Sequence, residues 1–123
     1  MKIGEVTANK EAVIKLIVLG QNGVQQEIPA ILDTGYTEYL KLPPQVIATL
    51  GLPYRYSLSM YLADGNPIRV RVFDGIVRWA GQERSIPVQE TEGDILLGMS
   101  LLYGSRLLID VLDGGEVTLN DIS

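Results

Sequence analysis

The sequence predicts a single, all-β domain with a small closed or sandwich-like core and one or two short helices. The hydrophobic residues recur mostly with a period of two, which is typical of strands that bury one face. Turn sequences rich in glycine, asparagine and aspartate separate the alternating segments. A chain of 123 residues is long enough for one domain and shows no linker, so we expect residues 1–123 to fold as one unit.

Short alternating runs mark the expected strands, which cover residues 13–19, 24–28, 68–73, 76–79, 86–88, 107–112 and 117–119. Along the run 68–73, Ile68, Val70 and Val72 should share one face of the strand, with arginines on the other. The apolar pair at 31–32 is expected to end a buried strand.

Two short helices are expected between these strands. The first covers Pro44–Leu50, because proline favours the first helical position, Gly51 suits the end and Pro53 prevents continuation. The second lies around residues 100–103, between Gly98 and Gly104. It is too short to persist without packing against the rest of the domain.

The composition restricts the chemistry that this chain can perform. It contains no histidine and no cysteine, which excludes Ser-His-Asp and Cys-His nucleophilic sites and the usual zinc ligand sets. A net charge of −5 argues against a nucleic-acid partner. The acidic residues Glu90, Glu92 and Asp94 lack calcium-loop spacing and are read as a solvated loop, so neither metal nor cofactor is expected. Paired carboxylates acting on water remain the natural catalytic candidate.

Asp33-Thr34-Gly35 is the most informative motif of the chain. Such a tripeptide is often only a turn, because aspartate bonds its own backbone and glycine accepts unusual dihedral angles. Here it directly follows Ile31 and Leu32, so the Asp33 carboxylate is expected at the end of a buried strand, where solvation is poor. Gly35 should let backbone N–H groups approach that carboxylate, and Thr34 should hold the loop with its hydroxyl.

A second motif favours a functional interpretation of Asp33-Thr34-Gly35 over a simple turn. Residues 94–98, Asp-Ile-Leu-Leu-Gly, form an apolar strand that ends in glycine and leads into the second short helix. Together with the motif at Asp33, this arrangement resembles the retropepsin-like aspartic proteases. Residues 33–43 and the helix after them look like the compact bacterial members, and residues 61–68 lie where that family carries its flap hairpin.

The resemblance implies a homodimer, because only one Asp-Thr-Gly is present and the mechanism of that family needs two facing aspartates. Each subunit would contribute Asp33 to a water-activating pair. Thr34 would cross-link the two loops, and Gly35 would present its carbonyl to the substrate. The alternative is a catalytically silent dimerisation or peptide-binding module of the same fold.

In the flap, the resemblance implies that Ala63, Asp64 and Gly65 form a tip that closes over an extended peptide substrate. Tyr61 is a candidate flap contact, although a lone aromatic in a strand more often packs. Asp64 is a turn residue first and a specificity residue second.

The chain also departs from the retroviral relatives. They carry a small residue and then an aspartate after the glycine of the first motif, where this chain has Tyr36 and Thr37, and an arginine in the second motif, where it has Met99. Tyr36 is expected to fill core volume rather than narrow the cleft.

No apolar run is long enough to cross a bilayer, so no membrane association is expected. The N-terminus lacks the pattern of a secretory signal, because charged residues interrupt its start. We therefore expect a cytoplasmic protein.

Overall fold

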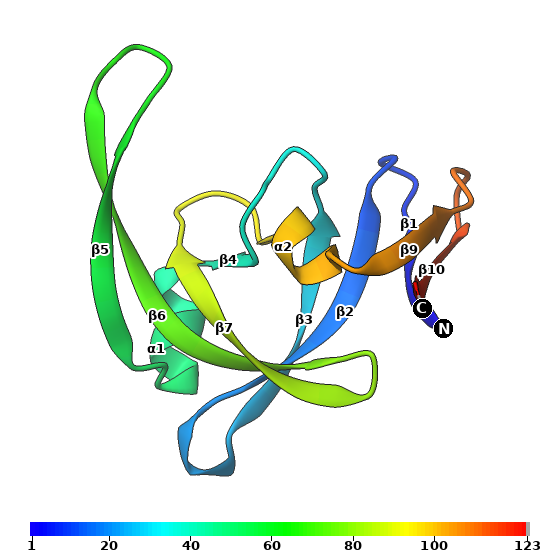
Figure 1. Cartoon of the computed structure of the whole chain (residues 1–123), viewed down its shortest axis with the longest axis horizontal. Coiled ribbons are helices and arrows are strands. Elements are labelled where there is room, and N and C mark those ends of the chain that lie inside the picture. Colours follow the sequence, from blue (N-terminus) through cyan, green and yellow to red (C-terminus); the bar gives the residue numbers. More distant parts are fainter. Residues whose placement is uncertain (123) are drawn as a thin grey trace.

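The alternating segments assemble into one ten-stranded sheet in the computed structural model of the chain, which describes residues 1–122 (Figure 1). The strands are β1 (Lys2–Val6), β2 (Ala12–Leu19), β3 (Gln25–Leu32), β4 (Leu40–Leu42), β5 (Tyr54–Tyr61), β6 (Pro67–Trp79), β7 (Gln82–Glu90), β8 (Leu96–Leu97), β9 (Ser105–Ile109) and β10 (Glu116–Asp121). A 3₁₀ turn, η1 (Gln21–Gly23), and two helices, α1 (Pro44–Leu50) and α2 (Met99–Leu102), complete the described elements.

The sheet closes on itself to form a small barrel. The strand order is β5-β6-β7-β4-β8-β3-β2-β1-β10-β9, and β6 pairs additionally with β2. This antiparallel pairing closes the strands β6, β7, β4, β8, β3 and β2 into a ring, so neither β6 nor β2 is an edge strand. The all-β fold with a closed core predicted from the sequence is therefore confirmed.

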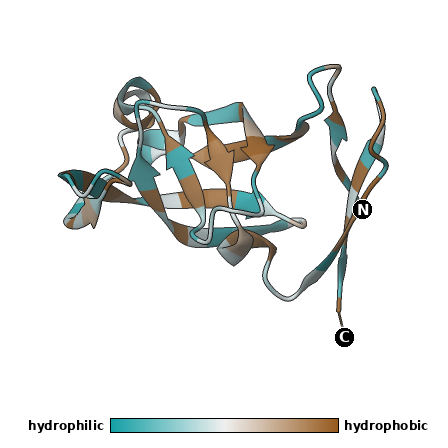
Figure 2. Cartoon of the chain, turned by 90° about the horizontal axis from the view of Figure 1, so that it is seen from above, coloured by the Kyte–Doolittle hydropathy of each residue, from teal (hydrophilic) through white to brown (hydrophobic). Residues whose placement is uncertain are grey.

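Two extensions leave the barrel on opposite sides. The β5–β6 hairpin continues beyond the barrel wall as a long two-stranded ribbon (Figure 1). On the other side, β1 pairs with β2 and β10, and β10 pairs with β9, so that both termini lie in one arm (Figures 1 and 2). β5 and β9 are the two edge strands of the sheet.

The core lies inside the barrel, where hydrophobic residues of its strands gather (Figure 2). The most deeply buried side chains include Val18 of β2, Leu40 of β4, Val88 of β7, Leu97 of β8 and Leu101 of α2. Because α2 contributes Leu101 and Leu102 to this core, its single turn is held by tertiary packing, as its length requires.

Both helices were predicted at their observed places. α1 matches Pro44–Leu50, with proline at its start and Gly51 in the left-handed region at its end, with φ of 65°. α2 covers Met99–Leu102, so both of its ends lie one residue earlier than those of the predicted segment 100–103.

The strand predictions need three corrections. The runs 68–73 and 76–79 are parts of one strand, β6. The run 107–112 ends at Ile109, because the Leu112 carbonyl accepts the Gly115 N–H within a turn. β1 and β4 were not predicted as strands, and of β5 only the end at Tyr61 was placed in one: β4 has three residues, and β5 is exposed along nearly all of its length and lacks a buried face.

The shared face of Ile68, Val70 and Val72 is not the core face. Ile68 is exposed and Val70 half-buried, and only Val72 is buried, outside the main core cluster. From Phe73 onward the buried residues of β6 are those at positions 73, 75, 77 and 79, so the face that points to the core changes after Val72. Within the described residues, no helix is long and apolar enough to cross a membrane.

Candidate active site

The parallel pairing of β3 with the short strand β8 brings the predicted motifs together. β3 and β8 pair in parallel, with Leu32 opposite Leu97, so the loops that follow them leave the barrel side by side. The Asp33 N–H donates to the Leu97 carbonyl at 2.9 Å. Asp33 therefore stands at the end of β3 as predicted, and the loop that carries it rests on the start of α2.

The Asp33 carboxylate is less buried in the single chain than its strand context suggested. Asp33, Ile31 and Leu32 are all half-buried, and Thr34 and Gly35 are exposed. The expectation of a poorly solvated carboxylate is wrong for the isolated subunit, because β3 ends at the rim of the barrel and not inside it.

Gly35 contacts the Asp33 carboxylate as predicted. Its N–H donates to Asp33 Oδ1 at 2.8 Å, which orients the carboxylate. A Cβ on Gly35 would lie 3.2 Å from the same oxygen, closer than most real contacts. Thr34 makes no side-chain hydrogen bond within residues 1–122, so its predicted loop-holding role has no support inside one subunit.

Helix α2 holds the rest of the loop by donating hydrogen bonds to two of the loop's backbone carbonyls. The Met99 N–H donates to the Tyr36 carbonyl at 2.8 Å, and Ser100 Oγ donates to the Thr37 carbonyl at 2.6 Å. Gly98 permits this approach, because a Cβ there would clash with the Glu38 carbonyl and lie 2.5 Å from Tyr36 Cδ2. The glycine before the helix is thus needed for space.

Tyr36 is half-buried and lies outside the hydrophobic core cluster, so it does not fill core volume as predicted, and it makes a polar contact that the sequence reasoning missed. Its hydroxyl donates to Gln89 Oε1 at 2.7 Å, and Gln89 is a buried polar side chain on β7. Lys41 Nζ lies 4.9 Å from the centroid of the Tyr36 ring. Burial, and secondarily the charge of Glu38, raise the pKa of Tyr36, so its hydroxyl stays protonated and remains a donor. The only sequence signal was an unusually large residue after Gly35.

The tip of the β5–β6 hairpin, where the flap was predicted, is a self-contained turn. The Asp64 carboxylate accepts hydrogen bonds from the backbone N–H and the side-chain amide of Asn66, both at 2.9 Å. Asp64 therefore acts as a turn residue, as predicted. Ala63 and Gly65 are exposed at the same tip, which extends from the end of the barrel that also carries the loop between β3 and β4 (Figure 1). No hydrogen bond joins this tip to Asp33 within the described residues.

A groove of about 530 Å³ runs beneath the flap. The flap lines it with residues that include Tyr61, Met60 and Ile68, and the opposite side is lined by Lys41, Gln89 and the segment 90–93. Tyr61, which is 77% exposed, thus faces a cavity and is not packed in a core.

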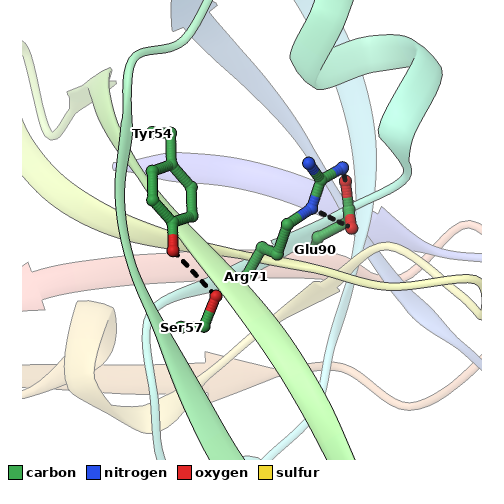
Figure 3. A network of polar contacts seen from close by, with 4 residues as sticks. All are labelled: Tyr54, Ser57, Arg71 and Glu90. Carbon is green, nitrogen blue, oxygen red and sulfur yellow. Dashed lines mark hydrogen bonds and ion pairs between the residues drawn. The ribbon is translucent and has the colours of Figure 1, made fainter.

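Arg71 and Glu90 join the flap to the barrel at its base. Arg71 Nε donates to Glu90 Oε1 at 3.0 Å, and a second guanidinium nitrogen contacts Oε2, which makes the pair bidentate (Figure 3). Beside it, the hydroxyls of Tyr54 and Ser57 share a hydrogen bond of 2.9 Å within β5 (Figure 3). The hydrogen bond and the charge of Glu90 raise the pKa of Arg71. A bidentate pair restricts the direction in which the flap leaves β7.

Across residues 1–122, no group of three or more carboxylates lies close enough together to hold a metal ion. The acidic segment at Glu90, Glu92 and Asp94 is split, because Glu90 turns to Arg71 while the other two are exposed.

Comparison with known proteins identifies the fold. No protein-family profile matches the chain, and no curated protein sequence matches it. Among solved structures, the crystal structure of a retropepsin-like aspartic protease from Rickettsia conorii superimposes with a TM-score of 0.56. The match covers 100% of this chain and 91% of that one, at 18% sequence identity. The chain therefore has a retropepsin-like fold, in agreement with the resemblance found in the sequence.

Proposed function

We propose that this protein is an aspartic endopeptidase that acts as a homodimer and hydrolyses extended peptides. Each subunit contributes one Asp33, and the two carboxylates meet across a twofold axis. The observation that carries the proposal is the Asp33 loop itself, with its Gly35 N–H on the carboxylate and its support from β8 and α2. The shared fold with an aspartic protease supports the same reading.

The chemistry follows from two acids in one site. Two carboxylates within hydrogen-bond distance do not both ionise readily, so the pair holds one proton and titrates as a unit. The ionised Asp33 removes a proton from a bound water, which attacks the peptide carbonyl. The protonated Asp33 of the other subunit donates a hydrogen bond or its proton to the carbonyl oxygen. The tetrahedral intermediate then collapses with protonation of the leaving amine, and no covalent acyl-enzyme forms.

Each subunit would also supply the parts that position the substrate. Thr34, whose hydroxyl makes no hydrogen bond within residues 1–122, would donate across the twofold axis to the partner loop. The Gly35 carbonyl would accept a backbone N–H of the peptide. The tip at Ala63, Asp64 and Gly65 would close over the peptide and exclude water, with Tyr61 against the substrate. No metal or organic cofactor takes part in this scheme.

The first experiment compares wild type with Asp33→Asn on a mixture of peptides from acidic to neutral pH. We expect cleavage by the wild type and its loss in the variant. Asp113→Asn is the matched control, because Asp113 is an exposed carboxylate in the turn between β9 and β10. Equal cleavage by Asp33→Asn and wild type would refute the assignment. Binding without cleavage by the wild type would instead favour a silent peptide-binding module.

A mixing experiment tests the shared site. Wild type and an excess of Asp33→Asn are unfolded together and refolded, so that subunits combine at random. If the site needs Asp33 from both subunits, mixed dimers are inactive and activity falls below that of wild type refolded alone. Unchanged activity would exclude a site on the twofold axis. Sedimentation at several concentrations reports whether the dimer forms only at high concentration.

A further inference from the structure

The groove beneath the flap contains two register-paired polar side chains. β4 and β7 are parallel, and their register places Lys41 opposite Gln89 and Leu40 opposite Val88. Leu40 and Val88 are fully buried in the core, so Lys41 and Gln89 project from the other face of the sheet. Both line the groove. Neighbouring strands lie about 5 Å apart, so the two side chains start close together.

The amide of Gln89 has a defined direction. Its oxygen accepts the Tyr36 hydroxyl at 2.7 Å, so its NH₂ group lies at the other end of the carboxamide. Within residues 1–122, that NH₂ donates no hydrogen bond to a protein group, and it is not among the fully buried unpaired atoms. Gln89 is only 6% exposed, and it lines the groove. Because its oxygen is taken by Tyr36, its two N–H donors are left for a group bound in the groove.

Lys41 adds an unneutralised charge beside these donors. None of the ion pairs in the described residues includes Lys41, and its ammonium lies over the Tyr36 ring. Glu90 also lines the groove, but both of its oxygens are taken by Arg71. The remaining charges of the groove are Arg69 on the flap and Glu92 on the opposite loop, one of each sign.

We propose that Gln89 and Lys41 form a polar subsite that selects peptide substrates with a hydrogen-bond-accepting side chain, a carboxylate or a carboxamide, at one position near the cleaved bond. The proposal rests on the endopeptidase function above and adds its substrate class. An extended peptide in the groove turns alternate side chains toward this wall. Glutamate or glutamine there would accept from the Gln89 amide, and glutamate would also meet the Lys41 ammonium. An apolar side chain would leave the donors unpaired, and a basic one would be repelled.

The test is the cleavage profile of a peptide library, measured as kcat/KM for each residue type at each position. Wild type should favour Glu and Gln over Leu and Lys at one position, with Glu favoured by about tenfold, as expected of a charge-assisted hydrogen bond. Lys41→Met should lose the advantage of Glu over Gln and retain that of Gln. Gln89→Leu should lose the advantage of Gln over Leu.

Two further variants separate direct recognition from a structural role. Lys41→Glu should reverse the preference at that position toward Lys and Arg, which a merely structural residue would not do. Arg106→Met makes the matched change at an exposed arginine of β9, outside the groove, and should leave the preference at that position unaltered.

The outcomes distinguish the two proposals. Cleavage that depends on Asp33 but shows no preference for Glu or Gln at any position would overturn the subsite and leave the endopeptidase intact. So would a Lys41→Glu profile identical to that of wild type. Absence of any cleavage that depends on Asp33 would overturn both.

Discussion

The hydrogen bond between Tyr36 and Gln89 can be measured as a free energy of unfolding. Tyr36→Phe removes the donor and leaves Gln89 Oε1 without its partner in a residue that is 6% exposed. Leaving a buried acceptor unpaired costs about 1–3 kcal/mol. Gln89→Leu removes the acceptor instead, and the half-buried Tyr36 hydroxyl can bond to water, so we expect a smaller loss of about 1 kcal/mol.

The double variant Tyr36→Phe/Gln89→Leu gives the decisive value. Replacing both partners by apolar groups of similar shape is nearly neutral, so its loss should be less than the sum of the single losses. The difference is the coupling energy, expected at about 0.5–3 kcal/mol for groups in contact.

Urea unfolding with linear extrapolation measures each free energy. All variants are compared at one protein concentration, because dimer formation would make stability depend on it. Tyr61→Phe is the control: it loses the hydroxyl of a 77% exposed tyrosine and should change stability by less than about 0.5 kcal/mol. Additive single losses, or equal effects of Tyr36→Phe and Tyr61→Phe, would refute the reasoning.

Two more predictions use the same assay. Because burial raises the pKa of Tyr36 above its unfolded value of about 10, the stabilisation is complete below that pH and is lost as pH rises toward the folded value. The advantage of wild type over Tyr36→Phe should therefore shrink by about 1.4 kcal/mol per pH unit above 10, and a constant advantage would contradict the burial of this hydroxyl. Gly98→Ala should cost about 1–3 kcal/mol and reduce cleavage, because its Cβ would clash with the Glu38 carbonyl, lie 2.7 Å from the Tyr36 carbonyl and displace the Asp33 loop. Gly93→Ala, whose Cβ would meet only Thr91 Oγ1 at 3.5 Å, should change stability by less than about 0.5 kcal/mol, and similar losses in the two variants would argue against crowding at Gly98.

Local chemistry explains which elements were predictable. Proline and glycine bracket α1, so its ends follow from dihedral preferences alone. β2 alternates between buried and exposed residues and was recognised from that period. β5 has no buried face to produce a period, and its strand exists because it pairs with β6. β4 has three residues, and β7 and β8 on its two sides stabilise it.

The candidate site likewise contains some residues that the sequence identified and others that only the structure revealed. The sequence identified Asp33, Gly35 and the apolar strand before Gly98, because each motif consists of a few consecutive residues. The partner of Tyr36 was not identifiable in this way, because Gln89 lies 53 residues away and contacts it only once β7 runs beside β4. Lys41 looked like an ordinary charged residue until its register opposite Gln89 was known.

Residue order alone thus determined the all-β character, the two helices and the Asp33 motif, since these depend on dihedral preferences and on the period of side chains along one strand. Folding in three dimensions determined the barrel closure through β2 and β6, the partial exposure of Asp33, and the groove with its polar wall. The physical reason is that burial and hydrogen-bond pairing between distant strands depend on register, which no short stretch of sequence contains.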